Sequence, residues 1–239
     1  MDVRSRGIRG DWAQKFKNLM HWPLAENIMR IDGKDKNSIL ILREVVGMDR
    51  SQSTHQYASE LLRAAVVATV SALDRYLHDL VLCHSWRLLS RSEKSIPAEL
   101  KKLALPVLAT KRALEKRAAE PKSRPGHLVK QAIQAQLHRE YTFQTPYSVL
   151  KAGRMLGVDD FWTDVAHQMA GNPAKAVVIE KLRLIVERRN QIVHEADLVR
   201  KTKAKCLTLR EIRLKDVKDW IDWMDQLGGA IDQVVQGAV

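Results

Sequence analysis

Cysteine is nearly absent from this chain. Only Cys83 and Cys206 occur among 239 residues, far apart in the sequence and outside any C-x-x-C pairing. That scarcity excludes a disulfide framework and a zinc knuckle, so we expect a reduced protein. The first residues also lack the apolar segment of a signal peptide. Together these two absences predict a cytoplasmic location.

Long apolar runs are missing as well. The longest mostly apolar run, Ala64 to Leu73, is interrupted by Thr69 and Ser71 and is closed by Arg63 and Asp74. A membrane-spanning helix needs about 20 apolar residues. The sequence therefore predicts no membrane-spanning segment and no membrane partner.

The chain also lacks the motifs of nucleotide-dependent and metal-dependent chemistry. It contains no G-x-G-x-x-G and no phosphate-binding G-x-x-x-x-G-K. Asn190, His194 and Asp197 are close in sequence, but asparagine is a poor ligand for transition metals, and no second histidine or cysteine follows at a ligand spacing. We expect neither a metal nor a cofactor.

Positive charge is abundant. The chain carries 40 Lys and Arg residues against 28 Asp and Glu residues, a formal net charge of +12, which favours an anionic partner such as RNA. One basic group in the middle of the chain is typical of a solvated helix face. A second group follows within a dozen residues of His194 and predicts contacts with RNA phosphates, although a plain solvated loop is an equal alternative. This second group consists of Arg200, Lys201, Lys203 and Lys205.

Apolar residues recur at spacings of three and four throughout the chain, which predicts an all-α fold. We expect an N-terminal helical arm over residues 1–53 and one compact helical domain over residues 54–239. Thr145 and Pro146 are typical of an N-cap and a first helical turn. The predicted helices are Asp11–Met20, Asn37–Val46, Thr54–Leu89, Val107–Ala119, His127–His138, Pro146–Leu156, Asp160–Met169, Ala174–Leu198 and Leu214–Val235.

The most informative segment is Glu187 to Asp197. At about 100° per residue, Arg189 falls at the centre of an apolar helical stripe. A guanidinium in that position calls for a carboxylate, a partner subunit or a phosphate. Asn190 and His194 stand four residues apart on a flank of the same helix and border Arg189. The stripe comprises Val178, Leu182, Ile185, Val186, Ile192, Val193 and Ala196.

This segment resembles HEPN domains. Arg189-Asn190, three residues and His194 is the R-N-x-x-x-H form of the HEPN R-x4-6-H motif, and the run from Arg188 to Leu198 is similar to the RiboL-PSP type. Arg50 and His55 have the same spacing but lack both the asparagine and the apolar helix. The resemblance extends over most of the chain after about residue 54. It implies an antiparallel HEPN-like helical bundle with additional helices.

The resemblance also implies a function. HEPN proteins that keep the arginine and the histidine are typically metal-independent endoribonucleases, and they dimerise with the two motif helices facing each other. Arg189, Asn190 and His194 are the expected catalytic residues, Arg188 is an expected RNA contact, and Glu195 is an expected supporting residue. The family suggests a setting in bacterial defence, stress or toxin-antitoxin systems, with an antitoxin or another protein as a further partner.

Three alternatives remain open from the sequence. The pair Asp74 and His78, four residues apart on the longest predicted helix, either supports Arg189 and His194 or forms an ordinary boundary salt bridge. A HEPN module that binds RNA or a protein without cleavage would use the motif at its dimer interface. A purely structural helical adaptor would give the basic charge no role.

Overall fold

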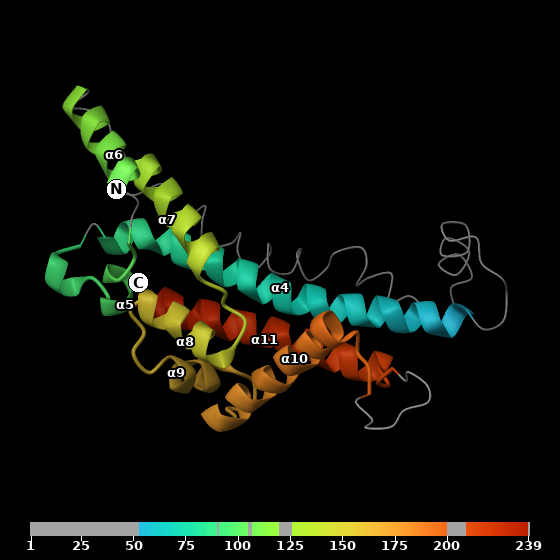
Figure 1. The fold of residues 1–239 in the computed structure, drawn as a ribbon. Helices are drawn as coiled ribbons and strands as arrows, with labels where there is room; N and C mark the ends of the chain where they lie inside the picture. The colour runs from blue at the N-terminus through green and yellow to red at the C-terminus, as the bar shows by residue number, and fades with distance from the viewer. Residues whose placement is uncertain (1–52, 90, 105–106, 120–125, 200–208, 239) are drawn as a thin grey trace, which may run out of the picture. The chain divides into compact units, whose positions relative to one another are not determined.

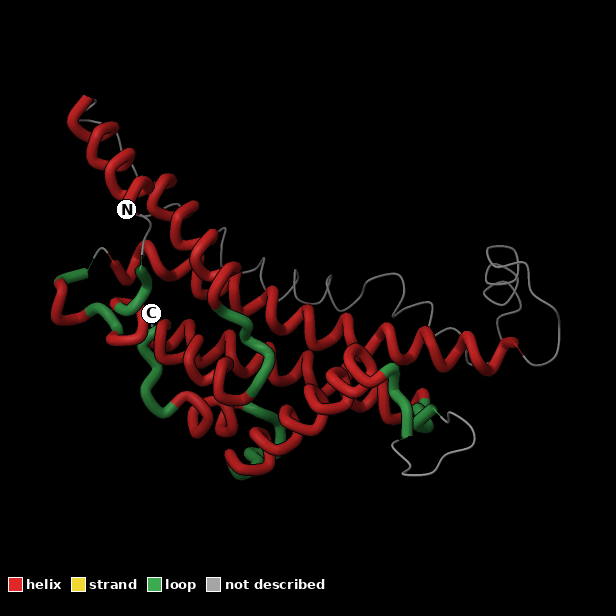
Figure 2. The backbone as a smooth tube through the Cα atoms, in the orientation of Figure 1, coloured by secondary structure: helices red, strands yellow, loops and turns green. Residues whose placement is uncertain are grey.

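The computed structural model describes residues 53–89, 91–104, 107–119, 126–199 and 209–238. All regular secondary structure in these ranges is helical (Figure 2), so the all-α prediction is confirmed there. The predicted helices Asp11–Met20 and Asn37–Val46 lie outside the described residues, as does most of the predicted N-terminal arm. None of the described helices is long and apolar enough to cross a membrane.

The helix boundaries follow the sequence closely. In chain order, and with the labels of Figure 1, the helices are α4 (Ser53–Leu89), η1 (Glu93–Ser95), α5 (Ala98–Lys101), α6 (Val107–Ala119), α7 (Gly126–Glu140), α8 (Pro146–Met155), α9 (Phe161–Gln168), α10 (Lys175–Glu195) and α11 (Leu214–Ala238).

Chain contacts divide the protein into two units. Unit 1 combines the described part of Met1–Ala72 with Leu184–Gly229, and unit 2 combines Leu73–Arg183 with Ala230–Val239. The long helices α4, α10 and α11 each contribute one stretch to both units.

Unit 1 is built on the apolar faces of these three helices. Its buried side chains include Val66 and Val70 of α4, Ile185 of α10, and Met224 and Leu227 of α11. Thr69, a polar residue of α4, is also buried, and its hydroxyl donates a hydrogen bond to the carbonyl oxygen of Ala65 at 2.8 Å. That bond satisfies the hydroxyl, so the polar residue fits in the core.

Unit 2 holds the aromatic core. Phe143 and Phe161 are fully buried. Helix α8 begins with the predicted cap, because Thr145 Oγ1 accepts from the Ser148 amide at 3.2 Å while Ser148 Oγ accepts from the Thr145 amide at 3.0 Å. Helices α6 and α7 lie side by side (Figure 1).

Candidate functional site

The predicted catalytic residues lie in the last two turns of α10. The apolar stripe of this helix is buried at Val178, Leu182, Ile185 and Val186. Burial then decreases toward the C-terminal end of the helix, where Ile192 is half-buried and Val193 is 45% exposed. The stripe thus continues beyond the part that the protomer core covers, and the R-N-x-x-x-H segment occupies that uncovered end.

Arg189 is half-buried in this segment. Its Nη1 donates to Oδ1 of Asn190 at 3.0 Å, while its Nε is buried and has no hydrogen-bond partner among the described residues. No carboxylate among the described residues forms an ion pair with it, although its place in the stripe calls for one. Within the described part of the chain, the guanidinium therefore keeps hydrogen-bonding capacity for a phosphate or for a second chain.

His194 lies at the other end of the motif and is exposed. It is five residues from Arg189, which puts the two side chains about 140° apart around a straight helix. Neither a hydrogen bond nor an ion pair involves its ring among the described residues. The imidazole is therefore open to solvent and able to exchange a proton with a bound molecule.

Helix α10 ends in an unusual way directly after this histidine. Glu195 is the last helical residue and is half-buried; Ala196 and Asp197 follow with φ of 49° and 56°. The Asp197 amide donates to the Gln191 carbonyl at 2.9 Å, six residues back, which satisfies one of the last carbonyls of the helix. The helix therefore stops three residues earlier than the apolar pattern predicted. This ending turns the Asp197 side chain inward, where it is fully buried.

The Asp197 carboxylate holds two arginines, an arrangement that we call the Asp197 clamp (Asp197, Arg63 and Arg188). Arg63 Nε donates to Oδ2 at 2.6 Å, Arg188 Nη2 donates to the same oxygen at 2.8 Å, and Arg188 Nη1 donates to Oδ1. Only 7% of the Arg63 side chain and 12% of the Arg188 side chain are exposed. The clamp ties α4 to both sides of the motif, because Arg188 directly precedes Arg189 and Asp197 follows His194 by three residues.

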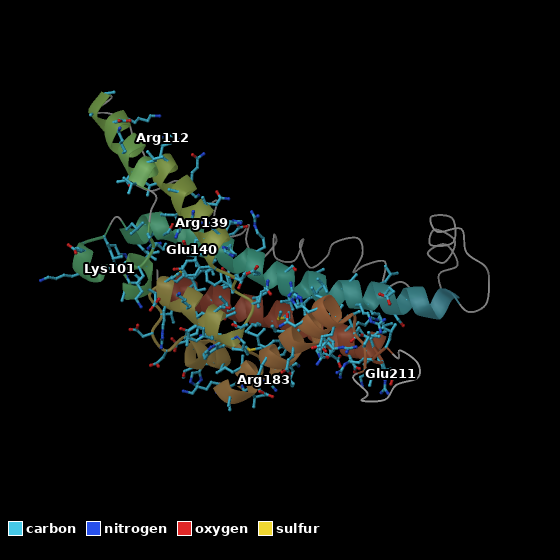
Figure 3. The ribbon with its side chains drawn as sticks, in the orientation of Figure 1. Lys101, Arg112, Arg139, Glu140, Arg183 and Glu211 are labelled. Carbon is cyan, nitrogen blue, oxygen red and sulfur yellow. The ribbon has the colours of Figure 1, made fainter. Side chains whose placement is uncertain are left out.

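Two backbone carbonyls complete the clamp. Arg63 Nη2 donates to the Arg210 carbonyl at 2.9 Å, and Arg188 Nη2 donates to the Glu211 carbonyl at 3.2 Å. The Arg210 amide donates to the Asp197 carbonyl at 2.8 Å, and Leu198 and Leu209 form an isolated antiparallel bridge. The chain that leaves α10 therefore returns to the same place before α11 begins. Glu211, labelled in Figure 3, lies on this returning segment.

Arg188, predicted as an RNA contact, is thus engaged inside the protein. Burial lowers the pKa of its guanidinium; Asp197 opposes that effect, and the positive charges of Arg63 and Arg210 add to it. Both of its Nη atoms donate to protein acceptors, namely the Asp197 carboxylate and the Glu211 carbonyl. The contact with RNA stays a prediction, and the structure gives Arg188 an internal partner that the sequence did not indicate.

The predicted supporting pair lies in unit 2. His78 Nε2 is 3.7 Å from Asp74 Oδ1, so the interaction four residues apart along α4 is confirmed. The same carboxylate accepts from the Phe143 amide at 2.5 Å and from Gln144 Nε2 at 3.3 Å. The His78 ring packs against Phe143 and His138, with centroids 4.7 and 4.9 Å apart. These contacts fix the connection between α7 and α8, and support of Arg189 or His194 stays a prediction.

Other parts of the predicted site are not described. The basic group Arg200, Lys201, Lys203 and Lys205 lies outside the described residues. Sequence reasoning missed Arg63 and Arg210 entirely and considered Asp197 only as a metal ligand. The one signal in the sequence for this arrangement was Asp197 itself, an acidic residue at the end of the motif helix. The described ranges contain no group of three or more histidine, cysteine, aspartate or glutamate side chains that could hold a metal ion.

Comparison with known proteins points to one family. A family model described as RiboL-PSP-HEPN matches residues 35–236. No curated protein and no solved structure matches the chain. The match includes all of α4 and α10 and nearly all of α11, and therefore every residue of the motif and of the Asp197 clamp.

Proposed function

This chain belongs to the RiboL-PSP-HEPN family, and we propose that it is a metal-independent endoribonuclease whose active site forms between two copies. The observation that carries this proposal is the uncovered end of α10. There, a half-buried arginine and an exposed histidine lie beside the exposed side chain of Val193, and the Nε of that arginine has no hydrogen-bond partner in the part of the chain that the structure describes.

The uncovered surface is the argument for a second copy. Val193 is 45% exposed and Ile192 is half-buried, at the end of a stripe whose earlier residues, from Val178 to Val186, are buried. A two-fold axis beside this segment would cover it with the same segment of the partner. It would also overcome the angle of about 140° on one helix, because one chain's Arg189 would face the other chain's His194.

Each motif residue then has a role that its chemistry allows. His194 takes the proton from the ribose 2′-hydroxyl, or gives one to the leaving 5′-oxygen. Arg189 neutralises the charge that grows on the phosphoryl oxygens. Asn190, which already accepts a hydrogen bond from Arg189, orients the guanidinium. The 2′-oxygen bonds to phosphorus as the bond to the 5′-oxygen breaks, which yields a 2′,3′-cyclic phosphate and a 5′-hydroxyl.

The first experiment compares cleavage of labelled single-stranded RNA in EDTA by wild type, His194→Ala and Arg189→Ala. The matched controls are His167→Ala, which removes another exposed histidine, and Arg183→Ala, which removes an exposed arginine of α10, the helix that carries Arg189. We expect cleavage by wild type and by both controls, and loss of cleavage in both motif variants. DNA, which lacks the 2′-hydroxyl, should remain intact. RNA binding without cleavage by every protein would instead favour a non-catalytic HEPN module.

The second experiment tests the composite site. Arg189→Ala and His194→Ala chains are mixed and allowed to exchange subunits. A mixed dimer keeps one of the two arginine–histidine pairs, with the two residues on opposite chains. Because random exchange makes about half of the dimers mixed, we expect on the order of a quarter of the wild-type rate. A site formed within one chain would recover nothing on mixing. Sedimentation of each variant shows whether the dimer itself survives the substitution.

A further inference from the structure

Three guanidinium groups gather at the end of α10. Besides Arg63 and Arg188 of the Asp197 clamp, Arg210 lies there. Its amide donates to the Asp197 carbonyl at 2.8 Å, its own carbonyl accepts from Arg63 at 2.9 Å, and its side-chain charge is close enough to act on the Arg188 guanidinium. Arg210 is half-buried, and its Nε is buried without a hydrogen-bond partner among the described residues. A buried donor of this kind is costly to leave unpaired.

The carboxylates around this group do not balance it. Asp197 serves both Arg63 and Arg188, and Glu60 contacts Arg63 Nη1 at 3.2 Å. Glu211, the residue after Arg210, forms an ion pair with Arg213, whose Nε lies 2.8 Å from Glu211 Oε1. Three positive charges therefore face two carboxylates, and Arg210 is the one without an anionic partner among the residues that the structure describes.

The electrostatics of Arg188 point the same way. Burial lowers the pKa of its guanidinium first, Asp197 opposes that change, and the neighbouring charges of Arg63 and Arg210 lower the pKa further. Cations in a partly buried cluster repel one another unless an anion joins them. The natural ligand for a guanidinium in this setting is a phosphate group, which accepts several hydrogen bonds at once.

We propose that Arg210 forms a phosphate-binding site beside the motif, and that its occupant is a phosphodiester of the RNA strand held at Arg189 and His194. The placement supports this occupant, because Arg210 is bonded through its backbone to Asp197, three residues beyond His194. This inference rests on the proposed function, since it assumes that RNA lies along the end of α10.

The first test measures RNA binding as a function of salt for wild type, Arg210→Gln and the control Arg183→Gln. The control removes the same charge from an exposed position on α10. Loss of one phosphate contact lowers the slope of log K against log salt concentration by about 0.7 for a single strand. We expect that reduction for Arg210→Gln only. Circular dichroism checks that each variant is folded.

The second test uses inorganic phosphate and separates the two sources of the ligand. Melting temperatures are measured in phosphate and in chloride at equal ionic strength. We expect phosphate to raise the melting temperature of wild type and of Arg183→Gln but not of Arg210→Gln. A phosphate effect at Arg210 with an unchanged RNA slope would support the site and overturn RNA as its occupant. Equal behaviour of all three proteins in both tests would overturn the site itself.

The two tests also distinguish the failure of this inference from that of the proposed function. If wild type binds and cleaves RNA and Arg210→Gln binds it with the same slope, RNA is overturned as the occupant of the site and the proposed function stands. If wild type neither binds nor cleaves RNA, the proposed function fails, and the phosphate response alone then supports or overturns the anion site.

Discussion

Asp197 is the residue on which the end of the motif helix depends. Its carboxylate is 1% exposed and receives three N–H groups from two arginines. An asparagine at this position would keep the side-chain shape and one acceptor oxygen, and asparagine tolerates the φ of 56° found here. The substitution Asp197→Asn therefore removes the negative charge while leaving the backbone conformation available.

The expected loss follows from the burial of the two partners. Breaking a buried ion pair by removing one member costs about 3–5 kcal/mol, because it leaves the other charge uncompensated. Here Arg63 and Arg188 both stay in place, with 7% and 12% of their side chains exposed. Since asparagine still accepts one hydrogen bond, we expect a loss near the lower limit, about 3 kcal/mol. That is a large share of the ~5–15 kcal/mol by which a domain is typically stable.

Urea unfolding followed by far-ultraviolet circular dichroism, at one fixed protein concentration, measures this loss. The matched control is Glu180→Gln, which breaks an exposed pair of similar geometry, with Arg183 at 2.8 and 2.7 Å, and should leave the midpoint unchanged. Adding Arg63→Met to Asp197→Asn should recover about 1–3 kcal/mol, because one of the two uncompensated buried charges is gone. A loss below about 1 kcal/mol for Asp197→Asn would refute the argument from burial.

Two further predictions concern unit 2. Gly153→Ala places a methyl carbon 2.2 Å from Cδ2 of Phe161, and the overpacking cost of about 1–3 kcal/mol should exceed the gain of about 1 kcal/mol in helix propensity. Gly229→Ala, in open space on α11, should be neutral or stabilising, and equal melting temperatures for the two variants would contradict the clash. Burial lowers the pKa of His78 below its usual 6.5, so the unfolded chain binds more protons than the folded one. Stability should therefore decrease as pH falls through 6.5, and a His78→Phe variant that keeps the full slope in urea titrations would exclude His78 as a source.

The positions of the helices could be predicted from the sequence because their signals are local. Apolar spacing predicted α4 and α6 at their observed bounds to within a residue, and Thr145 with Pro146 marked the start of α8. The predicted C-terminal end of α10 was three residues too late. The apolar pattern continues through Ala196, whereas the backbone enters the left-handed region at Ala196 and Asp197. That change depends on the partners of Asp197.

The sequence alone indicated the family, which the family model confirms, and it alone predicted Arg189, Asn190 and His194 as the motif residues. Which arginine receives a carboxylate was decided only by the tertiary structure. The helical wheel placed Arg189 at the centre of the apolar stripe. The buried carboxylate of Asp197 nevertheless pairs with Arg188, the residue before Arg189, and with Arg63, which lies 134 residues away from Asp197 in the sequence. Periodicity fixes the direction in which a side chain leaves its own helix. The partner of that side chain comes from a distant segment. Only the packing of the distant segment decides which of its side chains becomes the partner.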